Sequence, residues 1–167
     1  SRDGILKAKC EMFDYAADDV KAFVNGDDDK LITLKDIART FGMDPSRDVW
    51  ADSVEKLGFD GVRCRIHTDT KNSFETVIPL PGTHMVYNAM AGTCIGLALG
   101  LSIDEIRAGI ESLKPLPGRS NILHTEHYTL LDDCYNANPA SMMESLNVLD
   151  DTHSRKVAIL GDMGELG

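Results

Sequence analysis

The sequence predicts an α/β protein, and three observations lead to this prediction. Segments with the apolar spacing of helices lie at residues 3–15 and 86–99. Between them, apolar residues alternate with polar ones from 62 to 66, which is typical of strands in an antiparallel hairpin. A continuous apolar run at 157–160 is typical of a strand buried on both faces. The chain has 167 residues, 43% of them hydrophobic, which suffices for one domain or parts of two.

The first forty residues are expected to alternate helix and strand. A short strand is predicted at 20–24, followed by turn residues, and a second helix is predicted over 31–41, where Gly42 ends it. We expect the acidic run at 27–29 to be a solvated loop. The apolar residues of the first helix share one broad face: Ile5, Leu6, Met12 and Phe13.

The region from 49 to 79 is expected to form the antiparallel hairpin. The helix at 86–99 is apolar nearly all round and rich in small residues, so we expect it to be buried, with Gly100 just past its end. Ser102 and Glu105 have the spacing of a capping box for the next helix. The inner face of that helix is expected to hold Ile103, Ile106, Ile110 and Leu113.

A stretch with two prolines and a glycine, 114–118, is the expected domain boundary. Beyond it, strands are predicted at 122–123 and 128–131, then a helix with Asn138 as its N-cap and a proline at its first position. With the buried strand at 157–160, this order predicts a right-handed parallel crossover that opens a Rossmann-like domain. The helix has three apolar residues at helical spacing: Met142, Leu146 and Leu149.

Composition excludes some classes of function. A formal net charge of -10 argues against a binder of nucleic acid or anionic membranes, since such proteins carry basic patches. The four cysteines lie far apart without a zinc motif, and Cys94 is expected to be a small buried hydrophobe. The sequence shows no signal segment and no apolar run that could cross a bilayer. We therefore expect a cytoplasmic protein, and its abrupt ends suggest a piece of a longer one.

Residues 130–139 are the first candidate site. A hydrophobic strand runs into Asp132 and Asp133, and polar amides follow at a helix start, which is where α/β proteins bind ligands. A carboxylate there can accept hydrogen bonds from a ribose diol, and the free backbone amides of the helix suit an anion. The alternative is a capped helix with a solvated turn.

Residues 80–88 are the second candidate site. A Pro-Gly turn brings His84 and Asn88 to the start of the buried helix, where an asparagine amide can pair with adenine and a histidine can stack on the base. The alternative is that both residues only cap the helix. Lys9 is the third candidate, on a helix with short neighbours, although a solvated lysine is the commoner case.

Two glycine patterns exclude particular nucleotide sites. Gly161, Gly164 and Gly167 form G-x-x-G-x-x-G, which differs from the dinucleotide fingerprint, so NAD binding is not favoured. The sequence contains no G-x-x-x-x-G-K-[ST], so we expect no phosphate-cradling loop within it.

Taken together, these segments resemble the Mur ligase family. The matching pieces span nearly the whole chain in the family's order, most weakly between residues 29 and 59: SRDGILKAKCEMF, VNGDD, LPGTHMVYNAMA, LPGR, LLDDCYNANPASM and RKVAILGDMGELG. The pieces DDCYNANP and GDMGELG point to the branch that adds D-alanyl-D-alanine. The family has a UDP-sugar domain, a central ATPase domain and a Rossmann-like third domain. The resemblance implies that residues 1–116 are the later part of the central domain and 117–167 the start of the third.

The resemblance also implies a reaction and its cofactors, ATP and Mg²⁺. The tripeptide carboxylate of a UDP-N-acetylmuramoyl tripeptide would become an acyl phosphate, and the amine of D-alanyl-D-alanine would displace phosphate, with magnesium spreading the phosphoryl charge. Lys9 matches a lysine that is often carbamylated and helps to hold magnesium. Arg119 matches an arginine that reaches the nucleotide from the third domain. The implied ATP-binding residues are His84, Asn88, Arg119 and Asp133, and those near the amino substrate are Asn136 and Asn138.

One departure from the family concerns the adenine side. His84 is followed by Met85 where the family usually has asparagine, and Thr83 replaces a commoner arginine, so Asn88 carries more of this assignment. Two alternatives stay open: another Mur-type amino-acid ligase, and a non-catalytic Mur-like binding module. The isolated chain is expected to be inactive without a phosphate loop, and the full-length enzyme is expected to be monomeric.

Overall fold

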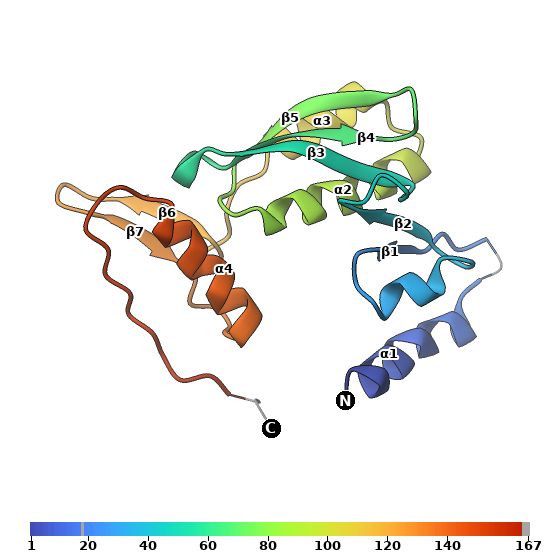
Figure 1. Cartoon of the computed structure of the whole chain (residues 1–167), viewed down its shortest axis with the longest axis horizontal. Coiled ribbons are helices and arrows are strands. Elements are labelled where there is room, and N and C mark those ends of the chain that lie inside the picture. The colour runs from blue at the N-terminus through green and yellow to red at the C-terminus, as the bar shows by residue number, and fades with distance from the viewer. Residues whose placement is uncertain (18, 165–167) are drawn as a thin grey trace.

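The structure is a computed structural model that describes residues 1–17 and 19–164. A five-stranded sheet with helices forms the larger part, and a two-stranded sheet with one helix forms a second part (Figure 1). The α/β class is therefore confirmed. The elements, in chain order, are α1 (Arg2–Cys10), the 3-10 helix η1 (Glu11–Tyr15), β1 (Phe23–Asn25), η2 (Leu31–Leu34), β2 (Arg39–Gly42), β3 (Val49–Lys56), η3 (Gly58–Asp60), β4 (Val62–His67), β5 (Ser73–Ile78), α2 (His84–Ala98), α3 (Ile103–Glu111), β6 (Asn121–His124), β7 (Thr129–Asp132) and α4 (Pro139–Asp150).

The large sheet has the order β1-β2-β3-β4-β5. Strands β1, β2 and β3 pair in parallel, whereas β3, β4 and β5 pair antiparallel. The β4–β5 register opposes Val62 to Ile78 and Ile66 to Phe74, and all four side chains are buried. The hairpin predicted from alternation is confirmed, because one face of it carries the apolar residues to the core.

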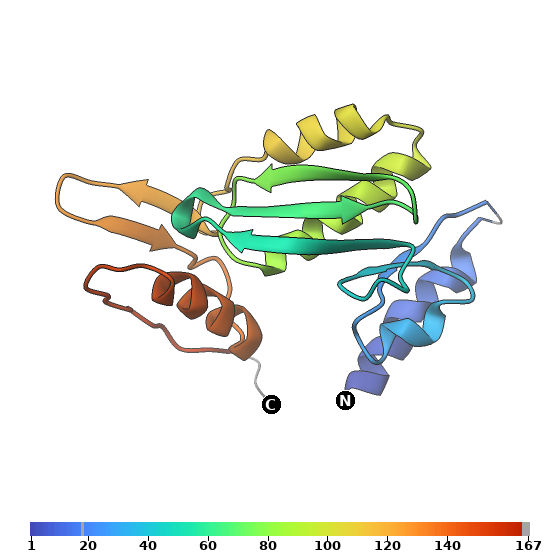
Figure 2. The ribbon, with the colours of Figure 1, turned by 45° about the horizontal axis from the view of Figure 1, so that its top comes forward.

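Helix α2 lies across one face of this sheet and contacts each of its five strands (Figure 2). Val86, Met90 and Cys94 of α2 are buried in the core, as the apolar pattern predicts. The prediction of all-round burial is wrong at Ile95 and Leu99, which are exposed on the face turned away from the sheet. Gly100, with φ at +81°, follows the end of α2 as predicted.

Helix α3 packs against β5 and α2. Its capping box is confirmed, since the Ser102 side chain accepts from the Glu105 amide and Glu105 bonds back to Ser102. Ile106 and Ile110 are buried as predicted. Leu113 is exposed instead, because α3 ends at Glu111 and Leu113 lies beyond its inner face.

One prediction for the first forty residues is wrong, and another is incomplete. A helix is expected over 31–41, but the first half of this segment forms only the short η2. The second half forms β2, because its backbone pairs in parallel with both β1 and β3. The acidic run at 27–29 is a turn with Asp29 exposed, as expected. Its side chains are also hydrogen-bonded, since Asp28 accepts from the Lys30 and Leu31 amides and the Asp27 side chain is only 22% exposed. The strand expected at 20–24 is β1, a few residues later.

The second part begins after the turn at 114–118. Strands β6 and β7 lie where two strands are predicted, and they pair antiparallel. Helix α4 begins at Pro139 with Asn138 as its N-cap, as predicted. The buried parallel strand expected at 157–160 is wrong: this segment is extended without strand pairing, and Ile159 is 93% exposed. Among the described residues, β7 pairs only with β6, and 157–160 faces β7 across a cavity without backbone pairing.

The two parts meet where α4 approaches the turn before α2. Val148 of α4 is 5% exposed, and its Cγ2 would lie 3.2 Å from a Cβ at Gly82. The Lys56 ammonium at the end of β3 pairs with Asp151 at 2.9 Å. Among the described helices, none is long and apolar enough to cross a membrane.

Candidate functional site

The start of α2 presents two of the predicted site residues. Gly82, with φ at +100°, makes the turn, and a side chain there would clash with the His84 ring. His84 Nδ1 is buried without a hydrogen-bond partner and lies 3.5 Å from the Glu144 carboxylate of α4. Asn88 is exposed one turn later, and its amide donates to the Met85 sulfur, a weak acceptor. Neither residue caps α2, so the helix-cap alternative is wrong for both.

The carboxyl end of β7 carries a second group of site residues. Asp133 accepts from the Ser120 amide at 2.9 Å through Oδ1 and from the Ser145 hydroxyl through Oδ2. The neighbouring Asp132 accepts from the Gly118 amide at 3.0 Å. These bonds tie the end of β7 to the turn before β6 and to α4, so Asp133 is oriented by its surroundings.

The two predicted asparagines of this region differ in their contacts. Asn136 is exposed, and its side-chain oxygen accepts from the adjacent Ala137 amide at 2.9 Å. Asn138 caps α4, with its Oδ1 accepting from the Ser141 amide at 2.9 Å. The capping alternative therefore holds for Asn138, whose amide oxygen is already engaged. Asp133 and Asn136 line one cavity of ≈ 620 Å³ between β7, α4 and residues 157–164.

Arg119 lies on the turn that joins the two parts of the chain. Its guanidinium stacks over the Tyr135 ring, 4.1 Å from the centroid. The Tyr135 amide also donates to the Gly118 carbonyl at 3.0 Å, and a Cβ at Gly118 would lie 3.4 Å from this tyrosine. Tyr135 thus orients the arginine, a role that spacing in the sequence does not reveal.

Comparison with known proteins matches both parts of the chain. The Mur ligase middle domain model matches residues 1–96, more than half of the chain, and the Mur ligase glutamate ligase domain model matches residues 118–167. The chain belongs to the Mur ligase family.

Mur ligases of one kind are prominent among its relatives. The UDP-N-acetylmuramoyl-tripeptide–D-alanyl-D-alanine ligase of Escherichia coli (strain K12) is 33% identical over 98% of the chain and 37% of the relative. A crystal structure of MurF from Acinetobacter baumannii superposes with a TM-score of 0.90 at 32% identity, covering all of this chain and 37% of that one. MurF from Thermotoga maritima in complex with ADP, 23% identical, shares the fold with a TM-score of 0.83. The chain spans about a third of the length of these relatives.

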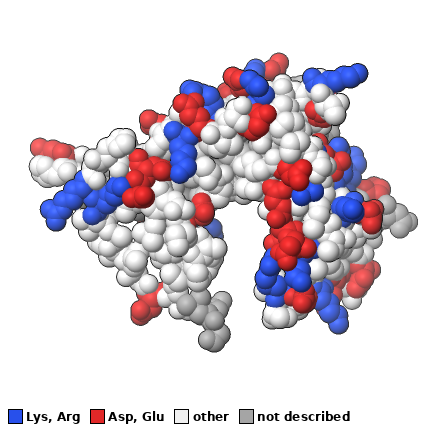
Figure 3. Space-filling model, viewed as in Figure 1, with Lys and Arg blue, Asp and Glu red and all other residues white. Residues whose placement is uncertain are grey.

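Lys9 lies on α1, at the opposite end of the large sheet from α4 (Figure 1). It is exposed on α1 and lines a cavity of ≈ 550 Å³ whose walls are mostly apolar side chains of α1, β1 and η2. Ion pairs from Arg2 to Asp28 and from Lys30 to Asp3 join α1 to the acidic turn. The surface around α1 therefore carries both signs of charge (Figure 3).

The described residues do not by themselves form a magnesium site. No group of three or more His, Cys, Asp or Glu side chains gathers within the described part of the chain. Lys9 could supply one oxygen donor if carbamylated, whereas magnesium demands near-octahedral coordination by several oxygens.

The described structure places the predicted residues in separate groups. Lys9 lines one cavity, Asp133 and Asn136 line another, and His84 and Asn88 share the start of α2. Two residues that the sequence reading missed are Ser145 and Glu144, which contact Asp133 and His84 from α4. Gly161 and Gly164 follow the extended segment, and Gly167 of the same predicted motif lies outside the described residues.

Proposed function

We propose that this chain is part of an ATP-dependent ligase that joins D-alanyl-D-alanine to a UDP-N-acetylmuramoyl tripeptide in peptidoglycan precursor synthesis. The observation that carries the proposal is the 33% identity, over 98% of the chain, to a ligase named for this reaction. Support also comes from the second family model, which covers the segment where DDCYNANP and GDMGELG lie.

The proposed reaction proceeds in two steps. The tripeptide carboxylate attacks the γ-phosphorus of ATP and ADP leaves, which gives an acyl phosphate. The dipeptide amine then attacks the acyl carbon, phosphate leaves, and the amine loses a proton. When bound, ATP supplies the activating phosphoryl group, and magnesium disperses its charge.

We further propose a division of labour between residues 1–116, as the late part of the central ATP-binding domain, and 117–167, as the start of the third domain. Asn88 and His84 would contact adenine. The exposed Asn88 amide supports this assignment, because it donates only to the Met85 sulfur and so leaves a polar group available to a base. Arg119, preoriented on Tyr135, would reach the phosphates, and Asp133 the ribose. Lys9, as its carbamate, would supply one of the oxygen donors to magnesium, and Asn136 and Asn138 would lie near the amino substrate.

The other proposed properties concern the whole enzyme. A cytoplasmic, monomeric protein without nucleic-acid partners fits nucleotide-linked substrates and a net charge of -10. The four cysteines are free, which suits a reducing compartment.

The test is phosphate release by the full-length protein that contains this chain, with ATP and UDP-muramoyl tripeptide, with and without D-alanyl-D-alanine. Release that requires the dipeptide supports the proposal. Release that instead requires a single amino acid assigns another Mur-type ligase, and no release with any amino substrate assigns a non-catalytic module. The isolated chain is expected to release no phosphate in the same assay.

A further inference from the structure

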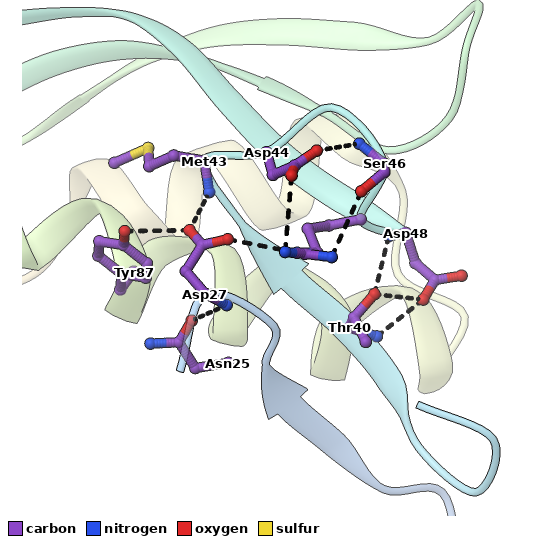
Figure 4. Close-up of polar contacts among 9 residues, drawn as sticks. Asn25, Asp27, Thr40, Met43, Asp44, Ser46, Asp48 and Tyr87 are labelled. Carbon is purple, nitrogen blue, oxygen red and sulfur yellow. Dashed lines mark hydrogen bonds and ion pairs between the residues drawn. The ribbon is translucent and has the colours of Figure 1, made fainter. Parts of the chain in front are cut away.

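Asp27 of the acidic turn joins three segments of the larger part (Figure 4). Its Oδ2 accepts from the Met43 amide at 2.5 Å and from the Tyr87 hydroxyl at 3.1 Å. Its Oδ1 accepts from Arg47 Nε at 3.2 Å, and both side chains of this ion pair are at least three-quarters buried. A single carboxylate therefore connects the loop after β1, the loop between β2 and β3, and helix α2.

Two glycines make room for this carboxylate. A Cβ at Gly42 would lie 2.5 Å from both Asp27 oxygens, and a Cβ at Gly26 would lie 2.5 Å from Arg47 Cδ. Real Cβ atoms do not approach so closely, so either substitution would force the pair apart. The Asp27 carboxylate is thus fixed on both oxygens by the chain around it, and Tyr87 donates to an acceptor that is already oriented.

Helix α2 begins without a side-chain cap. Thr83, at its N-cap position, makes no side-chain hydrogen bond to the helix, whereas α1, α3 and α4 are each capped by a side chain, from Ser1, Ser102 and Asn138. Its first turn is instead held by backbone bonds from the Met85 amide to the Gly82 carbonyl and from the Val86 amide to the Thr83 carbonyl, at 3.0 and 3.1 Å. Tyr87 lies in this first turn, between His84 and Asn88, and it is the residue that ties the turn to Asp27.

Tyr87 is suited to remain a donor. Desolvation raises the pKa of its hydroxyl, and the hydrogen bond to Asp27 and the charge of that carboxylate raise it further. The hydroxyl therefore keeps its proton at neutral pH, so the Tyr87–Asp27 bond persists across the working range of an enzyme.

We infer that Asp27 and Tyr87 are positioning residues that fix the first turns of α2, and with them Asn88, for nucleotide binding. This inference rests on the proposed function for its consequence and on the described hydrogen bonds for its geometry. Neither Asp27 nor Tyr87 is proposed to touch the nucleotide. Both residues act by orienting α2.

The kinetic test compares Tyr87→Phe with Tyr128→Phe in the full-length protein. Both variants delete one hydroxyl and keep the ring, but Tyr128 is exposed before β7, far from α2 in sequence. We expect Tyr87→Phe to raise KM for ATP about fivefold, with kcat and KM for the dipeptide changed less than about twofold, since a hydrogen bond to a charged acceptor is lost. Asp27→Asn combined with Tyr87→Phe should be no worse than Asp27→Asn alone, because the two residues act in one contact. An unchanged KM for ATP in Tyr87→Phe would overturn the inference.

A second test does not depend on enzymatic activity. Hydrogen exchange of this chain should show amides 86–90 of α2 exchanging about fivefold faster in Tyr87→Phe, while those of α3 match the wild-type chain. The Tyr128→Phe chain should match the wild type in both helices. Unchanged exchange in α2 would show that the Tyr87–Asp27 hydrogen bond does not fix the helix, whatever the kinetics show. Absence of dipeptide-dependent phosphate release in the wild-type enzyme would contradict the proposed function alone.

Discussion

The four cysteines differ in environment although none is paired. Cys64 and Cys94 are buried in the core, with 1% and 3% of their surface exposed. Desolvation, helped at Cys64 by the charge of Asp52, raises the pKa of each thiol to about 11. Cys134 is exposed, and its hydrogen bond to Asp132 is the main cause of a raised pKa there. Burial at Cys64 and Cys94 and the neighbouring carboxylate at Cys134 thus each favour the protonated thiol.

We expect a maleimide at pH 8 to label Cys134 and Cys10 in the folded chain, but Cys64 and Cys94 only after unfolding. The thiolate is the reactive form, and both core thiols are protonated and inaccessible at this pH. Because the folded state holds these protons up to about pH 11, the free energy of unfolding should fall as the pH rises from 9 toward 11. Mass spectrometry of labelled peptides checks the first point, and rapid labelling of all four sites would contradict it.

At the residue scale, the sequence predicts which residues are polar or capping better than it predicts which partners their side chains bond. The cap role of Asn138 follows from local spacing and is confirmed. The bonds of Asp133 to Ser120 and Ser145 come from residues 13 and 12 positions away, so no local pattern announces them. Asp27 was expected to be solvated for the same reason, since its partner Tyr87 is 60 residues distant. The nucleotide and substrate roles of these residues stay predictions.

The turn between β3 and β4 shows how one backbone position decides whether two elements pair. Gly61 has φ at +114°, and a Cβ there would clash with the Ile78 carbonyl of β5. Gly58 in the same turn also has positive φ, at +63°, but open space surrounds its missing Cβ. The two glycines therefore differ in steric overlap and also in backbone strain, since Gly61, with ψ at -144°, lies near a region that essentially only glycine adopts.

We expect Gly61→Ala to destabilise the fold by more than about 3 kcal/mol, because it adds overlap with a buried strand to the cost of positive φ. The matched variant Gly58→Ala should cost only about 1–2 kcal/mol, the strain alone. Urea unfolding followed by circular dichroism measures both. Equal losses in the two variants would show that the close approach of β5 to Gly61 relaxes.

At the element scale, predictions succeeded where pattern and caps agree and failed where tertiary pairing decides. The hairpin at β4 and β5, the helix α2 and the capping box of α3 follow from local signals. The segment at 39–42 overlaps the end of a helix predicted over 31–41, yet parallel pairing with β1 and β3 makes it a strand. The run at 157–160 has strand composition, yet it pairs with neither β6 nor β7, and a strand needs a neighbour for its backbone hydrogen bonds.

At the scale of the whole molecule, the two parts form an arch, with α1 and α4 below the large sheet at its two ends (Figure 1). The contacts of α4 and its C-cap with the larger part include Val148 against the Gly82 turn, Glu144 near His84, and Asp151 with Lys56. The two charged contacts are partly exposed, so solvent weakens them. The buried Val148 is the apolar centre of this small interface.

We therefore expect Val148→Ala to loosen the arrangement of the two parts without unfolding either. Removing two buried methyl groups should weaken the contact by about 1–3 kcal/mol, which is comparable to what so small an interface provides. Small-angle X-ray scattering should then show a larger radius of gyration, while circular dichroism retains the helical signal. Met143→Ala is the matched control, because Met143 lies on α4 but is 57% exposed, and its scattering should equal that of the wild-type chain. A Val148→Ala chain with an unchanged radius of gyration would show that the ion pairs alone keep α4 in place. In that case Lys56→Met, which removes the ammonium that pairs with Asp151, should produce the expansion instead.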